Sequence, residues 1–91
     1  MEGVYVLEKY PFYESGTIIM VSADLEKVKD CFKEIVDLKK EGYGYYIKKY
    51  ELGKKYSWSD YPDTIIWIEV DYDEKLKIIH NDRLVGELLN V

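Results

Sequence analysis

The chain has 91 residues, a length that fits one domain spanning 1–91 with a single modest core. Its 18 acidic and 13 basic residues give a formal net charge of −5, which disfavours direct binding to nucleic acid or a bilayer surface and favours a basic protein partner. A hydrophobic content of 47% excludes a disordered segment, and no run approaches the ~20 apolar residues of a membrane span. With one cysteine, Cys31, and no signal-peptide features at the N-terminus, we expect a cytoplasmic location.

The first half of the sequence predicts two strands followed by a helix. Residues 4–10 and 17–21 are rich in β-branched and aromatic side chains, and the turn-forming residues between them favour a hairpin. Across 25–38 the apolar residues recur at helical spacing, and Ser22 or Asp24 can serve as the N-cap. This amphipathic helix is the clearest element in the pattern.

The second half predicts further strands over 45–52, 64–72 and 75–80. The last segment, 83–89, fits a strand or a short helix, and we favour the strand. The resulting order, β-β-α-β-β-β-β, predicts a two-layer α+β domain. An antiparallel sheet of about five to six strands would carry one helix on one face, and the uncovered face would accept a partner or form a homodimer.

Three short segments share a pattern with a known group of proteins. They are Val4-Tyr5-Val6-Leu7-Glu8, Ile18-Ile19-Met20-Val21-Ser22 and Tyr46-Ile47-Lys48-Lys49-Tyr50-Glu51-Leu52. Over 4–52 the chain resembles short uncharacterised proteins of bacteriophage and prophage genomes of low-GC bacteria. The resemblance carries no functional residues. It implies an accessory factor that binds and inhibits a host protein, in the host cytoplasm if the chain is phage-encoded.

The residue types give little support to catalysis. Cys31 lies on the apolar side of the predicted helix, where an inert core thiol is expected, and His80, the only histidine, is expected at the surface. One cysteine and one histidine do not form a zinc-type ligand set, and there is no glycine-rich phosphate loop. The carboxylates of 71–74 lack the spacing of a calcium-binding loop. We therefore predict a protein that is not an enzyme and that uses no cofactor or metal.

Two rows of carboxylates are candidate partner-binding surfaces. At ~100° per residue, one row falls opposite the apolar side of the helix. Its members are Glu26, Asp30, Glu34, Asp37 and Glu41. Because side chains alternate along a strand, 64–72 places a second row on one face. Its members are Glu69, Asp71 and Asp73. The simplest interpretation is two solvated faces, but regular carboxylates could also imitate nucleic acid phosphates in a partner's basic groove.

The loop before the fourth strand is unusually aromatic, with Tyr56, Trp58 and Tyr61. We favour rings that fold back over a small core. In the alternative, Trp58 and Tyr61 form a contact patch for a partner, since both residue types are enriched in binding hot spots.

The leading functional hypothesis is a small acidic protein-binding module that inhibits a basic host protein, which could be a nucleic-acid-binding or defence protein. One alternative is a small-ligand or nucleotide-binding domain that uses the aromatic loop 56–61. Its best phosphate contacts would be Lys48, Lys49, Lys54 and Lys55. The other alternative is a self-associating structural module.

Overall fold

The computed structural model describes residues 3–91 and confirms the α+β class, with five strands and two helices. Their bounds are β1 Gly3–Pro11, β2 Thr17–Ser22, α1 Leu25–Ile35, β3 Tyr43–Glu51, β4 Asp63–Val70, β5 Leu76–His80 and α2 Asp82–Leu89. Within residues 3–91, no helix combines the length and the apolar character needed to cross a membrane.

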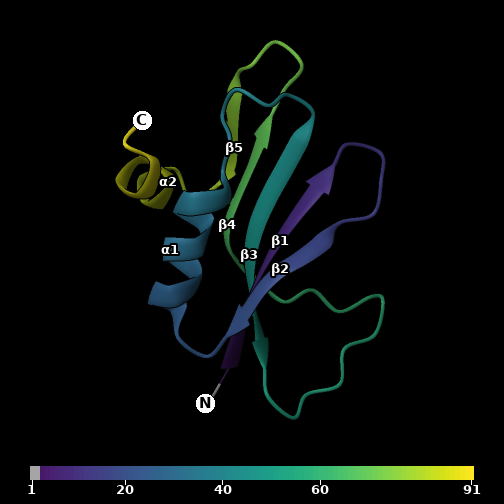
Figure 1. Ribbon diagram of the computed structural model, residues 1–91. Coiled ribbons are helices and arrows are strands. Elements are labelled where there is room, and N and C mark those ends of the chain that lie inside the picture. Colours follow the sequence, from purple (N-terminus) through teal and green to yellow (C-terminus); the bar gives the residue numbers. More distant parts are fainter. Residues whose placement is uncertain (1–2) are drawn as a thin grey trace.

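The five strands form one antiparallel sheet in the order β2-β1-β3-β4-β5 (Figure 1). Strands β1 and β3 are neighbours, although β2 and α1 separate them in the sequence. Their register places Tyr10 opposite Gly44, and the β3–β4 register places Gly44 opposite Glu69. Three residues that are distant in the sequence therefore lie in one row across the sheet.

The start of α1 follows the local sequence. The Asp24 side chain accepts a hydrogen bond from the Glu26 amide at 3.0 Å, which satisfies one of the free N–H groups of the first turn. Asp24 is therefore the N-cap, and Ser22 supports it by accepting a bond from the Asp24 amide at 3.0 Å. Further along the helix, Val28 and Phe32 are fully buried, as expected for its apolar side.

The C-terminal segment is a helix, α2, which corrects the strand that we favoured from the sequence. Asn81 adopts a left-handed backbone conformation and caps this helix by accepting a bond from the Leu84 amide at 3.3 Å. The Asn81 amide group also donates to the Ile65 carbonyl at 3.0 Å, which ties the cap to β4. A short apolar segment is compatible with both structures, and this tertiary contact is not visible in the sequence.

The core lies between the two helices and one face of the sheet. Its fully buried side chains are Leu7, Val28, Phe32, Tyr45, Ile47, Ile66, Ile68, Val70 and Val85. Because both helices contribute to this one cluster, they lie on the same side of the sheet (Figure 1). Strand side chains alternate, so Tyr46, Trp67 and Glu69 point to the other side. We call that side the open face, since no helix among residues 3–91 covers it.

We expect the substitution Val85→Ala to lower the free energy of unfolding by about 1–2 kcal/mol. Two buried methyl groups are lost, while the higher helix propensity of alanine offsets part of the cost. The matched control is Val91→Ala, because Val91 is 63% exposed and its truncation should change stability by less than about 0.5 kcal/mol. Urea unfolding followed by circular dichroism measures both values, and equal effects would contradict the docking of α2 on the core.

Candidate functional site

The predicted carboxylate row on the helix is shorter than expected. Helix α1 ends at Ile35, so Asp37 and Glu41 lie beyond it, which corrects their assignment to the helical row. The Asp37 side chain accepts a bond from the Lys39 amide at 3.0 Å, and such local bonds compete with the helical pattern.

The remaining members of the helix row are Glu26, Asp30 and Glu34, all of them exposed. Lys29 lies 3.1 Å from Glu26, and Lys33 lies 3.4 Å from Asp30. Lysines thus partly neutralise two of the three carboxylates, and this row is a weak candidate for binding a basic partner.

The second predicted row also does not form as expected, because β4 ends at Val70. Of its three members, only Glu69 lies in the strand. Asp71 begins a turn in which its carbonyl accepts the Glu74 amide at 2.9 Å, and Asp73 forms an ion pair with Lys75 at 3.3 Å. Glu69 and Asp71 nevertheless line one hollow together, whereas Asp73 is paired with Lys75 in the turn.

The aromatic loop mostly does not cover the core, which corrects the interpretation that we favoured. Trp58 is 94% exposed and Tyr61 is 87% exposed. Only Tyr56 folds back, since its hydroxyl accepts the Glu51 amide at 2.9 Å and its ring packs edge-on against Tyr50. The two exposed rings remain available for contacts.

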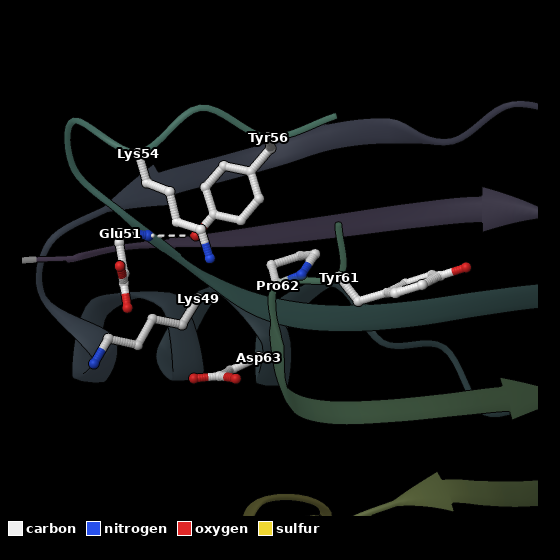
Figure 2. A pocket seen from close by; sticks show the side chains of 7 residues that line it. All are labelled: Lys49, Glu51, Lys54, Tyr56, Tyr61, Pro62 and Asp63. Atoms are coloured by element: carbon white, nitrogen blue, oxygen red, sulfur yellow. Dashed lines mark hydrogen bonds between the residues drawn. The ribbon is translucent and has the colours of Figure 1, made fainter. Parts of the chain in front are cut away.

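The loop encloses a hollow of about 220 Å³ (Figure 2). Lys49 and Lys54 both line it, as the nucleotide-binding alternative requires, but the carboxylates of Glu51 and Asp63 line the same hollow. Two cations and two anions give no net preference for a phosphate. Lys48 lines a different hollow, on the open face, because consecutive residues of a strand alternate.

The best-organised polar group in the molecule lies on the open face, and most of it was not predicted from the sequence. We call it the open-face cluster. Its members are Glu8, Tyr10, Tyr46, Trp67 and Glu69, all of them half-buried. The Tyr10 hydroxyl donates to Glu69 at 2.5 Å and accepts from the Trp67 indole N–H at 2.8 Å. Tyr46 donates to Glu8. The alternation of aromatic and acidic residues along β1 and β4 was the available signal, but the sequence did not reveal which strands are neighbours.

Tyr10 reaches Glu69 because a glycine stands between them. In the register, Gly44 of β3 separates Tyr10 on β1 from Glu69 on β4. A Cβ atom at Gly44 would overlap the Tyr10 ring, so the ring lies directly over the backbone of β3. Gly44 does not have a positive φ, unlike Gly42 and Gly53. It is required for space and not for an unusual backbone conformation.

The hydroxyl groups of Tyr10 and Tyr46 keep their protons at neutral pH, because both have raised pKa values. Burial raises the pKa of the Tyr10 hydroxyl, and its hydrogen bond to Glu69 raises that pKa further. Burial and the bond to Glu8 raise the pKa of Tyr46 in the same way. At neutral pH, both tyrosines therefore act as donors that hold the two carboxylates in fixed orientations.

Four members of the open-face cluster, Tyr10, Tyr46, Trp67 and Glu69, line a hollow of about 390 Å³. Glu14 and Gly16 of the β1–β2 loop border it, together with Lys48, whose Nζ lies 4.2 Å from the centroid of the Tyr46 ring. A second hollow of about 290 Å³ shares Tyr10 and Glu69 with the first and includes Asp71. Aromatic faces and carboxylates both attract cations. Among residues 3–91, no group of three or more His, Cys, Asp and Glu side chains is arranged to hold a metal.

Comparisons of the chain with protein-family models, with curated proteins and with solved structures find no match.

We expect Gly44→Ala to destabilise the fold by about 1–3 kcal/mol, because the new methyl group must displace the Tyr10 ring and break its bond to Glu69. Thermal or urea unfolding measures the loss. The control is Gly86→Ala within α2, where a Cβ has ordinary clearance and alanine should stabilise the helix by up to about 1 kcal/mol. If Gly44→Ala raises the free energy of unfolding, as Gly86→Ala should, Tyr10 does not require the glycine.

The tyrosine pKa values also predict the response to alkali. Tyr10 and Tyr46 hold their protons more tightly in the folded chain than in the unfolded chain. The contribution of these groups to the free energy of unfolding should therefore be fully present and independent of pH below the ordinary tyrosine pKa of about 10, and should be lost as the pH rises above it. Urea unfolding across this range should show a shallower fall in the double variant Tyr10→Phe, Tyr46→Phe. Tyr13→Phe, at a ring that is 97% exposed, controls for the loss of a hydroxyl.

Proposed function

We propose that this chain is a protein-binding module that engages a basic partner with the open face of its sheet. The observation that supports this most strongly is the open-face cluster, which places three aromatic rings and two oriented carboxylates on an uncovered surface. We further propose that binding inhibits the partner, as the resemblance to phage accessory proteins implies.

The chemistry of the open face suits a protein partner. Ile18 and Val21 on β2 are 58% and 54% exposed. Ile18 pairs with Glu8 across the strands and therefore shares its face, next to the aromatic cluster. Aromatic anchors with apolar and polar surroundings are the usual composition of protein-binding hot spots.

The charge distribution supports a basic partner and favours the open face over the helix. The net charge of −5 would attract a basic protein from a distance. On α1 the nearby lysines offset the local charge of Glu26 and Asp30. The helical row also lacks the length that imitation of nucleic acid phosphates requires. On the open face, Glu14 and Glu69 border one hollow opposite a single lysine, Lys48.

A matched pair of charge reversals tests this proposal. Glu14→Lys and Glu34→Lys each raise the net charge by two units, from −5 to −3, at exposed positions on the open-face hollow and on α1 respectively. Tagged wild-type protein should capture a basic protein from a low-GC bacterial lysate at low ionic strength and release it in a salt step. Measured with that purified partner, the affinity of Glu14→Lys should fall about tenfold, while Glu34→Lys should bind nearly as well as wild type.

Two results would contradict the proposal. A larger loss in Glu34→Lys would move the binding surface to the helix. Equal losses in both variants would mean that the partner senses only the net charge and that the open face has no special role.

A further inference from the structure

We infer that the hollow of the open-face cluster is a receptor site for a single arginine side chain of the partner. The inference rests on the proposed function and adds the chemistry of the anchor. The feature that carries it is the half-buried Glu69 carboxylate, which lines one hollow together with the Trp67 indole and the rings of Tyr10 and Tyr46.

Glu69 is oriented and retains an oxygen for an external donor. Its Oε2 accepts the Tyr10 hydroxyl at 2.5 Å, and Trp67 fixes that hydroxyl by donating to it at 2.8 Å. Within the part of the chain that the structure describes, no hydrogen bond uses Oε1 of Glu69. A carboxylate accepts several hydrogen bonds, and one that is already held in place loses little conformational freedom when a second donor arrives.

The aromatic walls have the geometry that a planar cation needs. The centroids of Tyr10 and Tyr46 are 5.8 Å apart and their planes meet at 39°, so the two rings form an angled surface beside the carboxylate. A guanidinium group can stack on one ring while its N–H groups point to Glu69. Guanidinium is also more weakly hydrated than ammonium, and its transfer to a half-buried site costs less. The chemistry therefore favours arginine over lysine.

The molecule already places a cation at the edge of this site. The Lys48 ammonium lies 4.2 Å from the centroid of the Tyr46 ring. An incoming guanidinium would compete with Lys48 for this ring and would be repelled by its charge. Removal of the Lys48 charge should therefore strengthen the binding of a cation and weaken the binding of an anion.

The test is a titration of the full chain with the peptide acetyl-Gly-Arg-Gly-amide, followed by two-dimensional NMR. The reporter is the indole N–H resonance of Trp67, which is identified because it persists in Trp58→Phe. We expect a saturable shift of this resonance with the arginine peptide and none with the peptide in which citrulline, the neutral analogue, replaces arginine. The lysine peptide should bind several-fold more weakly.

Three single-charge variants complete the test. Glu69→Gln, which preserves an acceptor for Tyr10, should weaken the arginine peptide about tenfold or more. Lys48→Gln should strengthen it roughly two- to five-fold. Glu87→Gln removes the same charge as Glu69→Gln, but on α2 at the other side of the sheet, and should leave the affinity unchanged. Lys48→Gln keeps the inference testable if Glu69→Gln does not fold.

The inference is overturned if the Trp67 resonance does not respond, if citrulline or lysine peptides bind as well as the arginine peptide, or if Lys48→Gln weakens binding. Failure here is distinguishable from failure of the proposed function. If the peptide does not bind but Glu14→Lys still loses the partner, the open face binds the partner by other contacts. If the peptide binds and the partner is indifferent to Glu14→Lys, the proposed function fails.

Discussion

The hydrogen bond from Tyr10 to Glu69 organises the open face. It joins β1 to β4 across the intervening strand β3, between residues that are 59 positions apart in the sequence. It exists only because Gly44 leaves room for the ring over the backbone of β3. The same hydroxyl accepts the Trp67 indole, so one tyrosine fixes both the acidic group and the largest ring of the candidate site. Removing the glycine would disturb all three.

The two faces of the sheet keep their apolar side chains from water in different ways. On the helix side, α1 and α2 remove apolar side chains from water, which is the main stabilising contribution in a chain of this size. On the open face no helix among residues 3–91 covers the strands, and the rings of Tyr10, Tyr46 and Trp67 are half-buried while the polar atom of each is hydrogen-bonded. Such a face stays folded without a cover, yet offers contacts to a partner.

Each predicted carboxylate row is shorter than expected because the helix or strand that carries it ends early, and side-chain periodicity does not predict where an element ends. On α1 the helix ends at Ile35, and the turn at Asp37 takes over. On β4 the strand ends at Val70, so Asp71 and Asp73 lie in the following turn, although Asp71 still lines a hollow together with Glu69. Periodicity assigns the faces of an element correctly, but it places the ends of the element only to within a few residues. Of the predicted partner-binding residues, only Glu69 belongs to the open-face cluster, and it does so through Tyr10, which the sequence pattern did not single out.

The elements that have a local signal could be predicted from the amino-acid pattern alone. Segments rich in β-branched and aromatic residues identified strands β1 to β5 to within two residues of their ends, helical spacing identified α1, and Ser22 and Asp24 remained as alternative N-caps. Three features depend on contacts between distant parts of the chain: the neighbours of each strand, the docking of α2 through Asn81 and Ile65, and the assembly of the open-face cluster. The physical reason is that spacing along the chain fixes which face a side chain takes, whereas register between strands, set by global packing, fixes which side chains meet across it.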